Sequence, residues 1–180
     1  TAAKYLRLWG GVDINVTLVE PSAMYTSNIM SNLVLNGSRT INSLAYGYTS
    51  VAAKYGVVVK QAWVQSIDTA AKSVTLSNGS TLPYDRLIVA PGIEFMNAFG
   101  LTQSDYESKT PHAWRAGPQT ELLRQQLAAI PLDGTFVMTI PKAPYRCPPG
   151  PYERACLVAD FLKTHKGAAS KVVVLDENAS

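Results

Sequence analysis

The sequence predicts an α/β fold, and three observations lead to this prediction. An apolar, β-branched run from Thr135 to Ile140 precedes a helical pattern that opens at Pro151, and a second apolar run from Lys171 to Leu175 ends in Asp176. This order of strand, helix and strand is that of a βαβ unit. Near the N-terminus, a helical pattern is followed by a strand pattern over residues 14–19. The composition, with 47% hydrophobic and 16% charged residues in 180, is that of a globular protein and excludes disorder or a fibre.

The N-terminal residues predict a helix and then a strand. Thr1 to Trp9 has apolar residues at helical spacing (Ala2, Leu6 and Trp9), and Gly10-Gly11 ends this pattern before the strand Ile14 to Val19. In a dinucleotide-binding βαβ unit these would be the crossover helix and the second strand. Glu20 then stands where an acid receives ribose hydroxyls. An incidental exposed glutamate at a strand end is the alternative interpretation.

The fold class follows from what precedes this helix. The first strand and the glycine-rich turn of such a unit are missing, so we expect the chain to begin just after the phosphate-binding turn of a larger protein. The predicted organisation is a Rossmann-like domain over residues 1–131, followed by the start of a second Rossmann-like domain over residues 132–180.

The middle of the chain predicts short elements. Residues 25–36 offer caps for a short helix in Ser27, Asn28, Ser31 and Asn32, and residues 55–64 alternate as a strand that ends at Val64. Residues 73–82 form a β-hairpin pattern, in which Asn78-Gly79 supplies the positive φ angles of a tight turn. A further strand, Tyr84 to Val89, ends at Ala90-Pro91-Gly92, where the backbone can pass close to a ligand because Gly92 has no side chain. A plain strand-to-loop turn has the same pattern.

Residues 95–118 are rich in loop formers and contain His112 and Trp114. No second histidine or cysteine stands at ligand spacing from His112, so we expect a loop histidine and no metal site. Pro118 opens a predicted helix to about Ile130, with leucines on one stripe. Residues 131–134 mark the crossing into the second domain.

The turn between the two strands of the C-terminal βαβ unit is unusual. A glycine-rich phosphate-binding turn works through free N–H groups, whereas four of the residues from Pro144 to Pro151 are prolines, which have none. We therefore predict that this unit binds no NAD. Cys147 follows Arg146 and precedes the helix, and both the cation and the helix dipole favour a thiolate. Cys156 lies inside the helix, where we expect it to pack as a small apolar residue. A Cys147–Cys156 disulfide would be strained by the proline-rich connection.

Glu153 stands in the first turn of that helix, six residues after Cys147. It can accept a proton from a substrate or from an intermediate on Cys147. The alternative is a carboxylate that only complements the helix N-terminus.

Five segments, taken in order, carry a resemblance to a known family. The segment Arg146-Cys-Pro-Pro-Gly-Pro-Tyr-Glu-Arg154 resembles the flavoprotein subunit of flavocytochrome c sulfide dehydrogenases and, less closely, the sulfide:quinone oxidoreductases. The further matches are Val16-Thr-Leu-Val-Glu-Pro21, Ser31-Asn-Leu-Val34, Tyr84-Asp-Arg-Leu-Ile-Val-Ala-Pro-Gly-Ile-Glu94 and Pro111-His-Ala-Trp-Arg-Ala-Gly117.

This resemblance implies a cofactor and a reaction. The first domain would bind FAD through residues that include Glu20, Pro21, Ser27, Asn32, Val64, Ala90, Pro91, Gly92 and Trp114. The catalytic residues would be Cys147 and Glu153, with Cys147 in a redox disulfide whose partner cysteine lies beyond Ser180. Sulfide would attack that disulfide, two electrons would pass to FAD, and a partner cytochrome c subunit carrying haem c would receive them in the periplasm. Many members hold FAD covalently through a cysteine in the segment that matches residues 25–31. Here no cysteine stands there, and Ser27 or Asn28 takes its place, so we expect non-covalent FAD.

Other functions remain open or are excluded. A quinone-reducing relative would be expected to have an amphipathic membrane-binding segment, and none is visible. A degenerate flavin-fold module that only binds a partner would lack flavin absorbance. Nucleic-acid binding is not expected, because lysine and arginine are scattered singly and the net charge is only +3. No apolar run approaches about 18 residues, so no spanning helix is expected.

Overall fold

The computed structural model describes residues 1–178 of the chain. These residues divide into two compact units: unit 1 comprises Thr1–Tyr25 and Tyr46–Glu94, and unit 2 comprises Thr26–Ala45 and Phe95–Ser180. The domain boundary predicted between residues 131 and 132 falls inside unit 2, and that division stays a prediction. None of the helices within residues 1–178 combines the length and apolar character needed to cross a lipid bilayer.

Unit 1 is a mixture of short helices and strands. Its elements are α1 (Ala2–Gly10), the short 3₁₀ helix η1 (Gly11–Asp13), β1 (Thr17–Val19), α3 (Thr49–Tyr55), β4 (Val58–Lys60), β5 (Val64–Asp68), β6 (Ser73–Leu76) and β7 (Thr81–Pro83). Two further strands, β2 (Met24–Thr26) and β3 (Ala45–Gly47), pair with each other where the chain leaves and re-enters this unit.

The predicted N-terminal helix and strand are present, but the strand is shorter than predicted and the apolar side chains of the helix are not buried. The strand covers only Thr17–Val19, because Gly11 has a φ of 56° and the chain makes a 3₁₀ turn before it extends. The apolar side chains of α1 are not buried, and Trp9 is 80% exposed. Instead, the Arg7 guanidinium ties α1 to α3, because its Nε donates to the Tyr55 carbonyl at 2.7 Å.

Two pairings organise unit 1. β1 runs parallel to β4, with Leu18 opposite Val59. β5, β6 and β7 form an antiparallel sheet, which confirms the predicted hairpin. Its turn differs in detail: only Gly79 has a positive φ (81°), and its N–H donates to the Leu76 carbonyl at 2.9 Å. A left-handed glycine after a type I turn closes a longer hairpin loop than an Asn-Gly turn with two positive φ angles.

The predicted strand from Tyr84 to Val89 is wrong. This segment bends at Asp85 and Arg86 and has no strand pairing, and Ile88 and Val89 are 59% and 62% exposed. A strand needs a neighbour with free N–H and C=O groups, and none of the strands within residues 1–178 pairs with this segment. An apolar β-branched run is therefore not sufficient for a strand.

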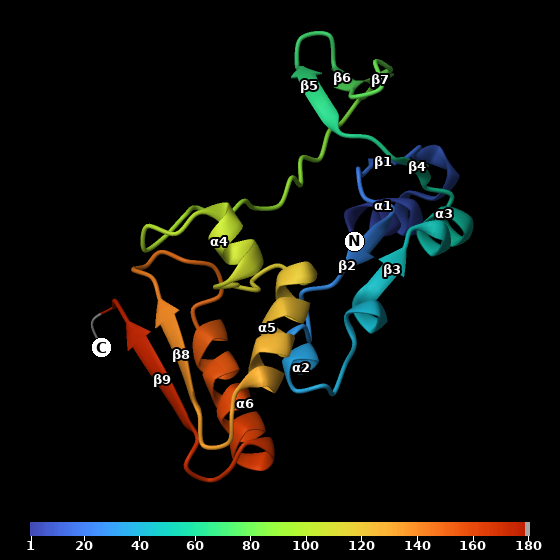
Figure 1. Ribbon diagram of the computed structural model, residues 1–180. Coiled ribbons are helices and arrows are strands. Elements are labelled where there is room, and N and C mark those ends of the chain that lie inside the picture. Colours follow the sequence, from blue (N-terminus) through green and yellow to red (C-terminus); the bar gives the residue numbers. More distant parts are fainter. Residues whose placement is uncertain (179–180) are drawn as a thin grey trace. The chain divides into compact units, whose positions relative to one another are not determined.

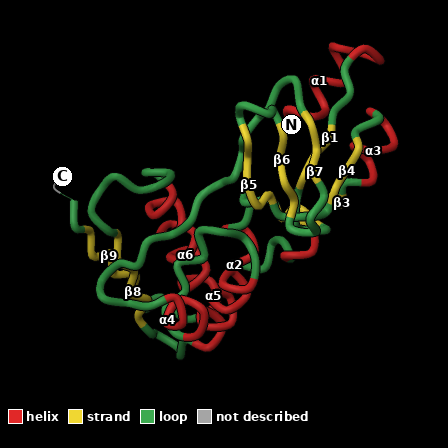
Figure 2. Tube along the Cα trace, turned by 90° about the horizontal axis from the view of Figure 1, so that it is seen from above, coloured by secondary structure: helices red, strands yellow, loops and turns green. Residues whose placement is uncertain are grey.

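Unit 2 holds the larger core. Its elements are α2 (Asn32–Leu35), the 3₁₀ helix η2 (Ile41–Leu44), α4 (Gln103–Ser108), α5 (Pro118–Ala129), β8 (Thr135–Ile140), α6 (Gly150–His165) and β9 (Lys171–Asp176). In Figure 1, α6 runs beside β8 and β9, and in Figure 2 the helices of this unit gather next to these strands. The buried residues of the core are Leu35, Ala113, Leu123, Leu127, Val158 and Leu162.

The C-terminal βαβ unit is confirmed with nearly the predicted bounds. β8 and β9 pair in parallel from Thr135 opposite Lys171 to Ile140 opposite Asp176. Phe136 and Val172 face α6 and pack against the core, while Val137 and Val173 lie on the exposed face. The two strands thus end side by side, and the turn after β8 lies next to the end of β9 (Figure 1).

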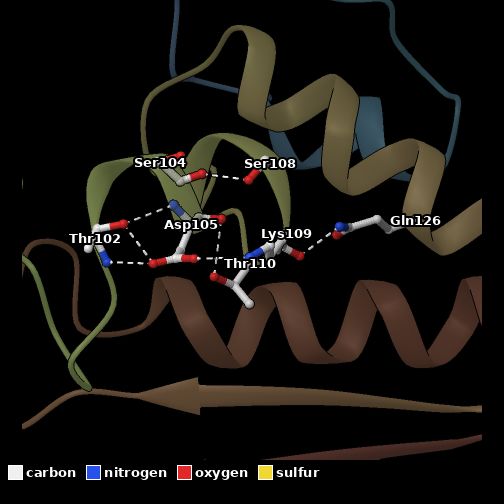
Figure 3. A network of polar contacts seen from close by, with 7 residues as sticks. All are labelled: Thr102, Ser104, Asp105, Ser108, Lys109, Thr110 and Gln126. Carbon is white, nitrogen blue, oxygen red and sulfur yellow. Dashed lines mark hydrogen bonds and ion pairs between the residues drawn. The ribbon is translucent and has the colours of Figure 1, made fainter.

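The helix α4 lies in the segment that was predicted to be loop. Figure 3 shows why it forms: the Asp105 carboxylate accepts hydrogen bonds from the Thr102 N–H (2.9 Å) and hydroxyl (2.7 Å), and Thr102 caps the Asp105 N–H in return. This is a capping box, which its Thr-x-x-Asp sequence signals. The Lys109 carbonyl accepts a hydrogen bond from Gln126 Nε2 at 2.8 Å, which links α4 to α5.

Candidate functional site

The candidate site in unit 2 is the proline-rich turn from residue 141 to residue 149, between β8 and α6. Cys147 lies exposed in this turn with a φ of 59°, and its carbonyl accepts the Gly150 N–H at 2.9 Å. A residue with a Cβ in the left-handed region costs on the order of 1 kcal/mol, so the surrounding contacts must hold it there. Within residues 1–178 both cysteines are free thiols.

Trp114 packs against this turn. Its indole Nε1 donates to the Arg146 carbonyl at 2.9 Å. A Cβ on Gly150 would lie 2.8 Å from Trp114 Cζ2 and 3.3 Å from Cys147 Sγ. Gly150 is therefore required, because a side chain there would collide with the indole where it approaches the first turn of α6. Trp114 and the Cys147 thiol both lie next to Gly150.

Arg154, one turn further along α6, reaches three oxygen atoms. Its Nη1 donates to the His112 carbonyl (2.5 Å), its Nη2 to the Ala113 carbonyl (2.9 Å), and its Nε to Asn32 Oδ1 (3.1 Å). The guanidinium also lies 4.5 Å from the centre of the Trp114 ring. Burial lowers the pKa of Arg154 to about 10.

The Asn32 side chain connects Arg154 to Glu153. Its oxygen accepts the Arg154 Nε bond, and its Nδ2 donates to Glu153 Oε1 at 2.9 Å. Of the residues predicted to act on substrate or cofactor, the structure thus brings Asn32, Trp114, Cys147 and Glu153 into one neighbourhood. Ser27 belongs to the same unit, where its N–H donates to the Leu44 carbonyl. Their predicted roles stay predictions.

His112 is a structural part of this neighbourhood. Its Nδ1 accepts the Trp114 N–H at 3.1 Å, and its ring lies tilted by 37° against that of Phe95, with the ring centres 4.4 Å apart. Burial, with further contributions from Arg154 and Arg115, lowers the pKa of His112. Within residues 1–178, no group of three or more histidine, cysteine or acidic side chains is arranged to hold a metal.

The exposed side of α6 carries two further side chains of interest. The Tyr152 hydroxyl donates to Asp176 Oδ2, and this bond raises the pKa of Tyr152 to about 12 and lowers that of Asp176. Cys156 is exposed, so the expectation that it packs as a small apolar residue is wrong. The buried stripe of α6 runs through Arg154, Val158 and Leu162, and Cys156 lies off that stripe.

The remaining predicted cofactor residues belong to unit 1. Glu20 follows β1, and its carboxylate accepts the Ser22 N–H at 3.0 Å. Burial first, and then Glu20, raises the pKa of Tyr48. Gln61 Nε2 donates to the Pro21 carbonyl at 3.3 Å.

A cavity of about 370 Å³ lies beside this strand end, lined by residues that include Ser22, Tyr48, Thr49, Val59 and Gln61. Its size is within the range of roughly 300–1,000 Å³ for ligand sites, and a carboxylate has about four acceptor positions, so Glu20 keeps capacity for hydroxyl donors. Glu20 is not itself among the lining residues, and its role toward a ribose stays a prediction.

The last four predicted cofactor residues are exposed. Val64 opens β5 opposite Leu76, and Ala90, Pro91 and Gly92 lie in a segment without regular secondary structure. The φ of Gly92 is 81°, and no atom lies within 4 Å of a Cβ built on it. The positive φ angle alone explains why glycine stands at position 92.

Sequence reasoning missed the most connected residue of the site. Arg154 stood at the end of the family motif, but it was not assigned a role. The available signal was its helical spacing from Val158 and Leu162, which places a charged side chain on a buried stripe. Such a side chain needs partners. Asn28, considered as a helix cap and as the substitute for a lost cysteine, accepts the Ala116 N–H at 2.7 Å.

Residues 120–180 match the family model described as sulfide dehydrogenase [flavocytochrome c] flavoprotein chain, central. The matched region includes Cys147, Glu153 and Arg154. It confirms the resemblance that the sequence motifs indicated.

Solved structures of oxidoreductases share the fold. The sulfide:quinone oxidoreductase from the hyperthermophilic bacterium Aquifex aeolicus has a TM-score of 0.70 and 19% identity, over 96% of this chain and 39% of that chain. Reduced Bacillus anthracis CoADR-RHD has a TM-score of 0.62 and 16% identity, over 97% and 30%. The ferredoxin reductase for the CYP199A2 system from Rhodopseudomonas palustris has a TM-score of 0.56 and 15% identity, over 96% and 38%. The chain thus spans well under half of each of these structures. These likenesses confirm the predicted α/β fold.

Proposed function

We propose that this protein is a flavin-dependent oxidoreductase that oxidises sulfide to sulfur or polysulfide, with Cys147 as the reacting thiol. The observation that carries the proposal is the match of residues 120–180 to the sulfide dehydrogenase flavoprotein family, because this region contains Cys147 and Glu153. The geometry of the turn supports it: the thiol is exposed, and a carboxylate stands in the first turn of the helix that follows.

The proposed reaction begins with Cys147 in a disulfide with a second cysteine, as the family resemblance implies. Hydrosulfide attacks the sulfur of Cys147, the S–S bond breaks, and the electron pair leaves with the second cysteine as its thiolate. Cys147 then carries a persulfide. When the disulfide re-forms, the outer sulfur atom is released, one proton is left for a base, and two electrons leave the cysteines.

The residues of the chain have defined tasks in this scheme. Glu153 accepts the proton, and Asn32 holds its carboxylate through the 2.9 Å bond to Oε1. A bound FAD supplies the acceptor for the electron pair and can pass electrons on singly to a haem. Glu20 and the cavity beside it are suited to the ribose end of FAD.

The electron acceptor and the compartment are part of the proposal. We expect a cytochrome c subunit with haem c as partner and a periplasmic location, in line with the family name of the matched region. A quinone acceptor is the second candidate, favoured by the structural likeness to the Aquifex aeolicus sulfide:quinone oxidoreductase.

Anaerobic addition of sulfide to the FAD-loaded protein tests the proposal. We expect loss of the oxidised flavin absorbance, and then its recovery on addition of a c-type cytochrome. Recovery with a soluble quinone but not with cytochrome would favour the second candidate. A protein that binds no flavin, or whose flavin does not respond to sulfide, would contradict both.

A further inference from the structure

Arg154 is a cation on the buried stripe of α6. Its side chain is 6% exposed, and arginine is rarely so buried without a partner charge. Among residues 1–178, no carboxylate lies within ion-pair distance of its guanidinium, which instead bonds to a side-chain amide and two backbone carbonyls. Three hydrogen bonds therefore hold the guanidinium in place, and the Glu153 carboxylate, which shares Asn32 with it, adds a longer-range electrostatic attraction.

The three acceptors come from two segments far apart in sequence. Asn32 belongs to α2, and the carbonyls of His112 and Ala113 belong to the segment that leads into Trp114. Ala113 is buried with a φ of 49°, a conformation that its surroundings must hold. The planar guanidinium of an arginine can donate hydrogen bonds to all three acceptors at once and also stack on the indole, whereas an ammonium group cannot.

Trp114 connects Arg154 to the turn that contains Cys147. The indole is held from one side by the Arg154 guanidinium at 4.5 Å, and its Nε1 holds the Arg146 carbonyl, directly before Cys147. The indole also lies against Gly150, whose position the Cys147 sulfur approaches as well.

We propose that Arg154 is a positioning residue: it holds Trp114 against the turn and thereby sets the place of the Cys147 sulfur. The inference rests on the proposed function of Cys147. Because Cys147 is already exposed, loss of Arg154 should leave its thiol accessible to small reagents. The productive geometry should be lost, and a misplacement of about 1 Å is worth on the order of 100-fold in rate.

The test uses Arg154→Lys, with Arg124→Lys as the matched control. Arg124 lies on α5 in the same unit and pairs with Glu121 at 3.7 Å. Each substitution is made in a protein in which every tryptophan other than Trp114, Trp9 and Trp63 included, is replaced by phenylalanine, so that acrylamide quenching of fluorescence reports Trp114 alone. Each is also made with Cys156→Ser and is reduced before labelling, and mass spectrometry of the peptide that contains Cys147 follows its alkylation by iodoacetamide. The activity readout is the rate of flavin bleaching by sulfide.

For Arg154→Lys we expect stronger quenching of Trp114, alkylation of Cys147 within a few-fold of the parent, and bleaching slowed about 100-fold. Arg124→Lys should leave all three unchanged. Parent-like quenching and bleaching in Arg154→Lys would overturn the proposal. If circular dichroism shows that Arg154→Lys does not fold, Trp114→Leu is tested in its place. Parent-like bleaching in Trp114→Leu would then overturn the proposal. The quenching readout needs neither sulfide nor flavin, so it separates failure of this inference from failure of the proposed function.

Discussion

The Tyr152 hydroxyl donates a 2.5 Å hydrogen bond to Oδ2 of Asp176, joining the first turn of α6 to the end of β9. Asp176 holds the strand-end position at which an acid receives ribose hydroxyls in a dinucleotide-binding unit. Its other oxygen accepts the N–H and the side-chain amide of Asn178. Both oxygens of the Asp176 carboxylate thus already accept hydrogen bonds from groups of the protein.

A pH titration tests this bond. In the folded protein the pKa of Tyr152 is raised from 10.0 to about 12, chiefly by its bond to Asp176. The bond therefore stabilises the fold fully below about pH 10, and this contribution is lost as the pH rises through about 12. Tyrosinate absorbance should show that the tyrosine lost in Tyr152→Phe is a late-titrating one. In Asp176→Asn that late component should move to lower pH, and its persistence there would contradict the assignment.

The second prediction concerns NAD. The prolines of residues 144–151 remove donors for a phosphate group, and Tyr152 occupies the acid, so the β8–α6–β9 unit should bind no NADH. Tyr152→Phe alone should not restore binding, because the prolines remain. Saturable binding of NADH at micromolar concentration, followed by fluorescence, would contradict this account.

The sequence was a good guide where structure is local. The bounds of β8 were predicted without error, and α5 was predicted to within one residue, because β-branched runs and leucine stripes pack against neighbours that the chain itself supplies. It was a poor guide where an element forms only with a partner from elsewhere in the chain: the run from Tyr84 to Val89 has the composition of a strand but no neighbouring strand.

The candidate site shows the same division. The motif identified Cys147 and Glu153 as neighbours of one helix end, but the hydrogen bond of Glu153 to Asn32 spans more than a hundred residues of sequence. No local pattern encodes such a contact. The burial of Arg154 and the exposure of Cys156 were both readable from helical spacing, once the stripe of Val158 and Leu162 is taken as the inner face.

The third prediction is that FAD is held non-covalently. Residues 25–31 have no thiol that can form a thioether, and Ser27 and Asn28 are engaged with the backbone of unit 2. Acid precipitation of the flavin-loaded protein should leave the yellow colour in the supernatant. Colour retained in the washed pellet would show that another residue forms a covalent bond.

The fourth prediction concerns the core of unit 2. Leu127 is fully buried between α5 and the elements packed on it, so Leu127→Ala should reduce the free energy of unfolding by about 2–5 kcal/mol. Leu132→Ala is the control, because Leu132 is 77% exposed, and it should change stability by less than about 0.5 kcal/mol. Urea unfolding followed by tryptophan fluorescence, in the background with Trp9→Phe and Trp63→Phe, measures both. Equal effects would mean that this core is wrongly assigned.

The most direct test of the central claim compares the two cysteines. Cys147 lies in the turn at the end of β8, and Cys156 lies on the exposed side of α6. A serine hydroxyl can form neither a persulfide nor a disulfide, so Cys147→Ser closes the covalent route. Stopped-flow bleaching of the flavin by sulfide under anaerobic conditions, at equal flavin content, should be abolished in Cys147→Ser and largely retained in Cys156→Ser. Bleaching of Cys147→Ser at the wild-type rate would contradict the disulfide mechanism and favour direct attack of sulfide on the flavin.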